Sequence, residues 1–337
     1  RAFRMSALTI ESEGRNVAEM NSAGVAPVMH RLLWLDAIRG IALIAMATYH
    51  FSWDLEFFGY LAPGTSTEGF LRLYARMIAS SFLFLAGFSL VLAHHPQLKL
   101  QAFLKRLAVI VAAALAISAA TWWFVPDGWI FFGILHCIAT ASVIGLLFLR
   151  LPPVLTLTAA IGAFALPNLW RSAIFDAPVL WFVGLSQNLP RSNDYVPLLP
   201  WLGALLCGVA VARILHDRNG FARLAKLPAG PAWLRWGGRH SLIIYLLHQP
   251  ILFALVYGMS LVVPAAKPDP AITYINSCES GCQGEGSSQA VCQRFCGCTL
   301  ERLQQQSLLE PLQSGAILPD QDERILKLAG ECSTTSQ

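Results

Sequence analysis

Three histidines lie within long apolar stretches of the sequence: His50, His136 and His248. A lone histidine on an apolar helix is generally a structural residue, but three of them on three membrane helices would be unusual in a purely structural bundle. Imidazole titrates close to neutral pH, so it can take up and release a proton where most side chains cannot. The three positions therefore predict a buried polar cavity equipped for proton transfer.

The stretch that ends on His50, LDAIRGIALIAMATYHF, carries two more ionisable residues at its start, Asp36 and Arg39. They are three residues apart, so they share a helix face and can form an ion pair. Charge inside a membrane is costly and is a functional hypothesis by default. The alternative is a neutralised pair whose arginine extends to the lipid headgroups. With a rise of 1.5 Å per residue, His50 lies about 21 Å beyond Asp36, near the opposite boundary.

Another apolar stretch, GRHSLIIYLLHQPILF, places Ser241, Tyr245 and His248 at positions i, i+4 and i+7 of one helix. Residues at these spacings lie on one helix face. Pro250 follows two residues later and frees backbone carbonyls at the same depth. Both features favour a polar cavity beside this helix.

Arg72 and Arg76 stand four residues apart at the start of a further apolar stretch. We expect them to pair with Asp54, Glu56 or Glu68 in the preceding acidic loop. The alternative is that this set binds an acidic or hydroxyl-rich substrate. The histidines outside the apolar stretches are expected to be solvated: His30, His94, His95 and His216.

Membrane helices must position these residues, because 55% of the chain is hydrophobic and only 13% is charged. Soluble domains carry roughly 25% charged residues, and a membrane helix needs about 20 apolar residues. The sequence therefore predicts an all-α, polytopic membrane helix bundle. The apolar segment 177–185 is too short to cross and is expected at the interface or as a re-entrant piece. About seven transmembrane helices are expected, near 32–53, 71–93, 103–124, 129–149, 153–170, 196–215 and 240–263.

The distribution of Lys and Arg predicts the orientation. Most of the basic loop residues fall on the side of the N-terminus, which the positive-inside rule assigns to the cytoplasm. Residues 1–30 are polar and mixed, lack the pattern of a cleaved signal peptide, and are expected to form a flexible cytoplasmic segment. With seven spans the C-terminus is expected to be extracytoplasmic.

The composition changes near residue 264, where a proline-rich linker leads into a polar segment with six of the eight cysteines. On the extracytoplasmic side these are expected to form three disulfides, and 15 connectivities are conceivable. The i,i+4 spacings favour Cys278–Cys296 and Cys282–Cys292 between two antiparallel helices turning at GEGSS, leaving Cys298–Cys332 to hold a last helix around 318–330. Zinc binding by the cysteines is the alternative. We assign this small helical tail, 264–337, no catalytic role.

With these residues established, RLLWLDAIRGIALIAMATYHF resembles the first helix of the heparan-alpha-glucosaminide N-acetyltransferase-like membrane acyltransferases. FFGILHCIA, LLPWLGALLCGVAVARI and GRHSLIIYLLHQPILF are also similar to bacterial members. The resemblance covers about residues 31–263 and leaves out the cysteine-rich tail. It implies transfer of an acetyl group from cytoplasmic acetyl-CoA to an amino sugar or hydroxyl of an envelope glycan or lipid-linked sugar.

The resemblance also implies roles for individual residues. Asp36 and Arg39 match the family's opening Asp and Arg-Gly, and would line the entrance for the donor. His50 falls where the lysosomal enzyme has an active-site asparagine, whereas that enzyme's catalytic histidine lies in the first luminal loop. That loop has no histidine here, so His50 is expected to do the chemistry, with Asp54 or Glu56, or loss of the chemistry, as alternatives. Candidates to bind the phosphates and the rest of CoA are Lys105, Arg106, Arg213, Arg239, His240, Ser241 and Tyr245.

Two other classes of function stay open. Intramembrane histidines and a proline-kinked helix also serve proton-coupled transporters and lipid translocases, although the chain has no internal repeat. A non-catalytic scaffold or sensor would use the disulfide-linked tail for recognition. The expected partners are membrane lipid and the sugar acceptor, without nucleic acid or a metal, and a homo-oligomer is not excluded.

Overall fold

The computed structural model describes residues 32–265, 269–284, 286–319 and 321–336, which form helices and no strands. The expected N-terminal segment 1–30 lies outside these ranges. The chain divides into two compact units. The larger contains the chain up to Phe51 together with Thr67–Phe253, and the smaller contains Ser52–Ser66 together with Ala254–Gln337.

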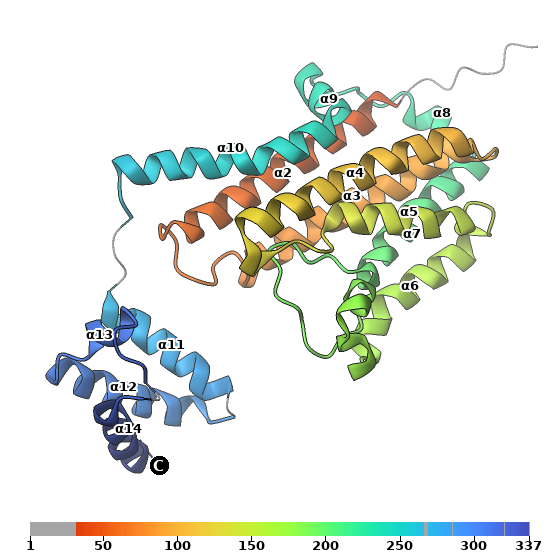
Figure 1. The fold of residues 1–337 in the computed structure, drawn as a ribbon. Coiled ribbons are helices and arrows are strands. Elements are labelled where there is room, and N and C mark those ends of the chain that lie inside the picture. Colours follow the sequence, from red (N-terminus) through yellow and green to blue (C-terminus); the bar gives the residue numbers. More distant parts are fainter. Residues whose placement is uncertain (1–31, 266–268, 285, 320, 337) are drawn as a thin grey trace, which may run out of the picture. The chain divides into compact units, whose positions relative to one another are not determined.

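The larger unit is a bundle in which α3, α4, α5 and α7 run side by side (Figure 1). The first helix, α2, passes into the smaller unit after Phe51, and the last, α10, does so after Phe253. Two short helices, α8 and α9, lie in the connection between α7 and α10. The helix bounds are α2 Leu33–Phe57, α3 Gly69–His94, α4 Leu100–Phe124, α5 Ile134–Phe148, α6 Pro153–Leu169, α7 Leu198–Asp217, α8 Gly220–Leu224, α9 Ala232–Arg239 and α10 Ser241–Val262.

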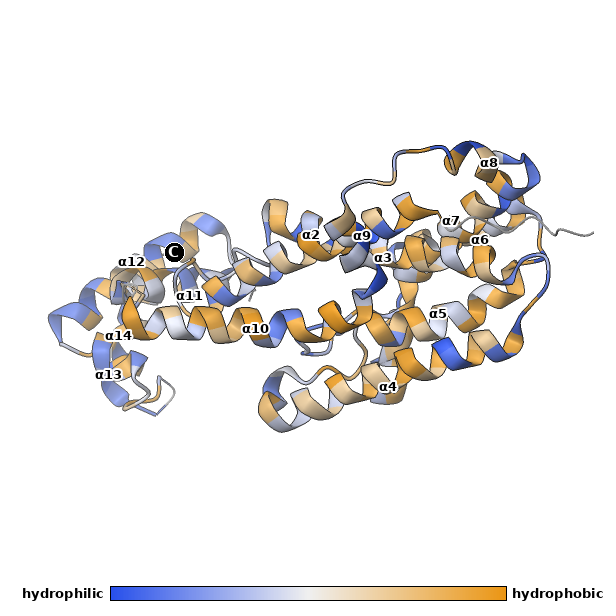
Figure 2. Cartoon of the chain, turned by 90° about the horizontal axis from the view of Figure 1, so that it is seen from above, coloured by the Kyte–Doolittle hydropathy of each residue, from blue (hydrophilic) through white to orange (hydrophobic). Residues whose placement is uncertain are grey.

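Within the described residues, four helices are long and apolar enough to cross a membrane: α3, α4, α7 and α10. Figure 2 shows these helices as mostly hydrophobic, in contrast to α8. Two further apolar helices, α5 and α6, have only 15 and 17 residues. Helices therefore occur at all seven predicted positions, while seven crossings are not established by length and composition.

The predicted span 129–149 is wrong at its start, because the helix begins at Ile134. A 3₁₀ turn at Pro126–Gly128 precedes it, and Trp129 donates its indole N–H to the carbonyl of Ser118 in α4. The short apolar segment expected at 177–185 forms a 3₁₀ helix, Pro178–Val183, that ends at Gly184.

The core of the bundle is the contact between α3 and α7. Leu83 of α3 and Leu205 and Val209 of α7 are completely buried. Gly208 lies directly against the backbone carbonyl of Phe84, so a side chain at this position would separate the two helices. Close approach through small residues is how membrane helices gain packing energy when lipid supplies no hydrophobic drive.

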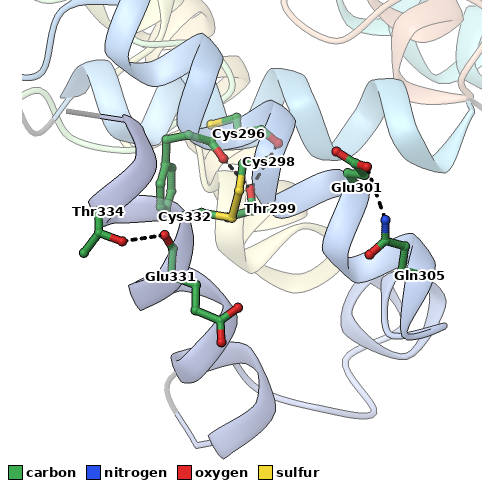
Figure 3. Close-up of a disulfide and its surroundings, with 9 residues drawn as sticks. Cys296, Cys298, Thr299, Glu301, Gln305, Glu331, Cys332 and Thr334 are labelled. Atoms are coloured by element: carbon green, nitrogen blue, oxygen red, sulfur yellow. Dashed lines mark hydrogen bonds between the residues drawn. A yellow bond between two sulfur atoms is a disulfide. The ribbon is translucent and has the colours of Figure 1, made fainter.

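The C-terminal tail folds as four helices: α11 Pro270–Gly284, α12 Gln289–Gln305, α13 Leu309–Gln313 and α14 Glu323–Ser336. Its disulfides are Cys278–Cys296, Cys282–Cys292 and Cys298–Cys332, the arrangement that the i,i+4 spacings favoured. Figure 3 shows the last of these joining α12 to α14. The apolar core is small, centred on Leu303, Ile325 and Leu328, so the disulfides carry much of the stability.

Candidate functional site

The carboxylate of Asp36, near the start of α2, pairs with two arginines. The side chain is 2% exposed, with Oδ1 lying 3.1 Å from Nη1 of Arg39 and Oδ2 3.6 Å from Nε of Arg239. Arg39 also donates from Nη2 to the hydroxyl of Ser89 on α3, over 2.5 Å. The pair predicted from the i,i+3 spacing is therefore present, and it is extended to α3 and α9 by two residues remote in the sequence.

Close contact between α2 and α9 makes this arrangement possible. Gly238 lies against the backbone carbonyl of Asp36, where a methyl group would clash. The neighbouring Arg239 is brought to the carboxylate by this approach, since α9 is only eight residues long and ends there. Gly238 therefore serves the site through its lack of a side chain.

A cavity of about 450 Å³ opens next to Arg39 in the larger unit. This volume is within the roughly 300–1,000 Å³ of small-molecule sites. Five of the predicted residues line it, namely Arg39, Lys105, Arg106, Ser241 and Tyr245. Its remaining wall is apolar and comes from α3, α4, α5 and α10, including Leu85, Ile110, Ile134, Leu135 and Leu242. The cavity thus combines a cationic rim with an apolar interior.

His50 of α2 and His248 of α10 form a close pair, with ring centroids 4.9 Å apart and the edge of one ring facing the other. Nδ1 of His248 lies 2.6 Å from the carbonyl oxygen of Tyr245. A carbonyl can only accept, so Nδ1 carries the proton and Nε2 has the free lone pair. Nε2 of His248 is buried and has no hydrogen-bond partner within the described part of the chain. Its lone pair is therefore held in place to accept a proton.

Tyr245 connects the cavity to this pair. Its side chain lines the cavity, and its ring centroid lies 5.6 Å from that of His248. Ser241, Tyr245 and His248 follow one face of α10, as the spacing predicted. Along α2, Arg39 and His50 are eleven residues apart, or about 16 Å at the helical rise. The cationic residue Arg39 and the histidine pair are therefore about 16 Å apart along α2, and neither His50 nor His248 lines the cavity.

The third histidine, His136, has a structural environment. It is the third residue of α5, and its Nδ1 accepts a hydrogen bond from the backbone N–H of Gly133 over 3.2 Å. Its Nε2 lies 3.3 Å from the hydroxyl of Ser118 on α4. These contacts cap α5 and join it to α4, so His136 is not brought to the histidine pair.

The same helix start is bound by Asp194, which the sequence did not single out. Its Oδ2 accepts a hydrogen bond from the backbone N–H of Ile134 over 3.0 Å, at the positive end of the α5 dipole. Burial raises the pKa of Asp194 to about 6 from an ordinary value of 3.8. Asp194 stands in the loop before α7, where no local motif indicates its role.

Three predicted donor-binding residues lie in other surroundings. Arg213 donates to the carbonyl of Leu149 and lies 4.0 Å from Asp217. Arg239 pairs with Asp36, and His240 donates from Nδ1 to the carbonyl of Trp236 over 2.9 Å. None of the three lines the cavity.

Among the described residues of the larger unit, Arg72 and Arg76 form no ion pair with Glu68 or another acidic side chain, so the expected pairing is not seen there. Glu56, in the smaller unit, accepts hydrogen bonds from the backbone N–H groups of Gly64 and Ser66, which closes its own loop. Asp54 is completely buried there. His94 is 4% exposed, so the expectation that it is solvated is wrong; its ring packs edge-on against Phe103.

The fold and the site define a class of protein: a helical membrane protein with a cavity lined by cationic side chains and a half-buried histidine pair. The family model of the heparan-alpha-glucosaminide N-acetyltransferase catalytic domain matches residues 31–250. The chain belongs to this family, and the family indicates a membrane acetyltransferase. Comparisons with curated proteins and with solved structures give no match.

Proposed function

We propose that this protein transfers an acetyl group from cytoplasmic acetyl-CoA to an amino sugar or hydroxyl of an extracytoplasmic glycan or lipid-linked sugar. The observation that carries the proposal is a cavity lined by three cationic residues and by Tyr245, whose ring contacts His248 of the pair His50–His248. A bacterial inner membrane is the proposed location. Family membership supports the reaction class, and the donor and acceptor are part of the proposal.

The cavity suits a donor with an anionic head and a long, slender arm. Arg39, Lys105 and Arg106 would bind the phosphates of CoA, since cationic side chains are the usual partners of phosphate oxygens. Asp36 holds Arg39 in position for this contact. The apolar wall would accept the arm that carries the thioester and direct it towards Tyr245.

The histidine pair supplies the base. The amine or hydroxyl of the acceptor attacks the thioester carbonyl and forms the new C–N or C–O bond, and Nε2 of His248 accepts the proton that the attacking atom loses. The C–S bond breaks, and the proton passes to the departing CoA sulfur, which leaves as the free thiol. His50 would contact the reacting groups from α2, opposite His248.

The experiment measures release of free CoA thiol by the purified protein in nanodiscs, with acetyl-CoA and a mixture of amino sugars. Because a positioned base contributes 10²–10⁴-fold, His248→Ala and His50→Ala should each lower the rate roughly 100-fold or more. The control is His240→Ala, whose side chain is exposed and lies against Trp236.

A wild-type protein that neither binds nor turns over acetyl-CoA would refute the proposal and favour the transport alternative. Equal loss in all three variants would indicate damage to the fold rather than loss of a base. A second series, Lys105→Gln and Arg106→Gln beside Arg223→Gln on α8, tests the donor site. The first two should raise KM for acetyl-CoA with little change in kcat, while the exposed Arg223 should matter little.

A further inference from the structure

A separate cluster of metal-binding side chains lies at the ends of α3 and α7, in the larger unit. His95 directly follows α3, while His216 and Asp217 are the last two residues of α7. One ligand atom from each lies within 4.8 Å of the others. The two imidazole rings meet at right angles with centroids 4.6 Å apart. None of these residues lines the cavity or belongs to the histidine pair of the proposed acetyl transfer.

One nitrogen of this cluster is buried without a partner. Among the described residues Nδ1 of His95 has no hydrogen-bond partner, and it is shielded from solvent, although buried polar atoms generally have a partner. An imidazole nitrogen in this position can supply a lone pair to a metal ion.

The remaining geometry also suits an ion. Nδ1 of His216 already lies 3.3 Å from Oδ1 of Asp217. An ion about 2 Å from each of three ligands in tetrahedral geometry holds them roughly 3 to 3.5 Å apart. The side chain of Asp217 is exposed, so its carboxylate can rotate to bring an oxygen closer to the ring of His95. Arg213 lies 4.0 Å from Asp217 and also donates a hydrogen bond to the carbonyl of Leu149, so it connects the carboxylate of Asp217 to that carbonyl.

We propose that His95, His216 and Asp217 form a binding site for one divalent transition-metal ion, with Zn²⁺ as the best match. Two imidazoles and one carboxylate are ligands that zinc accepts, with water in the fourth position. The ion joins the end of α3 to the end of α7, the two helices that form the core of the bundle. Its role is structural, because it joins the ends of the two core helices and its ligands are not among the residues that line the cavity of the proposed reaction.

The test uses the full-length protein, purified with an affinity tag free of histidine and stripped with a chelator. Zn²⁺ titration against a chromophoric competitor should show one saturable site, and binding should weaken at least tenfold in His95→Ala and in His216→Ala. His240→Ala is the matched control, because this exposed histidine lies outside the cluster, and it should bind as the wild type does.

Two further measurements keep the proposal falsifiable. Co²⁺ should give the visible spectrum of nitrogen and oxygen ligation, and a thiolate-to-cobalt band would instead assign the ion to Cys137 or Cys207. Saturating Zn²⁺ should raise the unfolding temperature of the wild type and leave that of Asp217→Asn much less changed. Absence of saturable binding to the wild type, or equal binding by all variants, would overturn the proposal and leave the two rings as a packing contact. Acetyl-CoA turnover is not a readout here, so failure of this site does not bear on the proposed transfer.

Discussion

At the scale of single residues, the site rests on groups that neutralise or orient one another. Asp36 stands between Arg39 and Arg239, and His248 is oriented by the carbonyl of Tyr245. The first pairing follows from the spacing of Asp36 and Arg39 alone. Arg239 and Ser89 could not be predicted as their partners, because helix packing brings them together from distant parts of the chain.

Asp36→Asn removes the only carboxylate that contacts both arginines in the described structure. Breaking a buried ion pair costs 3–5 kcal/mol, but Arg39 and Arg239 are 23% and 45% exposed, so we expect a smaller loss of stability, about 2 kcal/mol. Thermal unfolding in detergent measures it. Arg239→Gln should cost less, because Asp36 keeps Arg39, and a larger effect of Arg239→Gln would contradict this account.

Asp194 gives the fold a dependence on pH. Its pKa in the folded state is about 6, above the ordinary 3.8, because burial favours the protonated form. Its contribution to stability is therefore complete below the ordinary pKa and is lost as the pH rises through 6. A shift of about two units corresponds to roughly 3 kcal/mol. Unfolding midpoints measured on both sides of pH 6 should fall with rising pH in the wild type.

Asp194→Asn keeps an oxygen that can accept from the N–H of Ile134 but has no proton to lose. The variant should therefore lack most of the pH dependence around 6. An unchanged pH profile in Asp194→Asn would assign the dependence to another group.

At the scale of elements, the long apolar stretches predicted the helices well, because a backbone in lipid must satisfy its own hydrogen bonds. The start of α5 was misplaced by five residues, from 129 to 134. The signals that would have corrected it are Pro126 and Gly128, which favour a turn, and the capping contacts of His136 and Asp194. Asp194 is remote from Ile134 in the sequence, so no local sequence pattern links the two residues.

The disulfide Cys298–Cys332 is the covalent link between α12 and α14, across a separation of 34 residues. Closing a loop of this length stabilises the folded tail by about 3–4 kcal/mol in the chain-entropy model. The double variant Cys298→Ser, Cys332→Ser should therefore release α14, which contributes only Ile325 and Leu328 to the small apolar core. Amide hydrogen exchange should accelerate in α14 and remain nearly unchanged in α3 and α7 of the larger unit. Uniform acceleration in both units would contradict a local role.

At the scale of the whole molecule, the side of the membrane on which the disulfide-linked tail lies depends on the number of helices that cross. Three disulfides would favour a tail on an oxidising side of the membrane, and the basic loops would favour a cytoplasmic N-terminal side. The four described helices that qualify by length and composition would, if they alone crossed, leave both ends on the same side. A tail on the side opposite the N-terminus would require an odd number of crossings, and α2 would be the first further candidate because Asp36 is neutralised by its two arginines.

If α5 and α6 also cross as a pair, the total is seven and the tail is extracytoplasmic. Protease added to right-side-out vesicles should then remove the tail, while inside-out vesicles should protect it. A tag on the exposed loop between α7 and α10 serves as the control and should show the reverse pattern. Cleavage of the tail only in inside-out vesicles would require an even number of crossings and a cytoplasmic tail, where reducing conditions argue against its three disulfides. The acceptor side of the proposed reaction depends on this result, since His50 lies near the end of α2 that leads into the smaller unit and contacts His248 in the first half of α10.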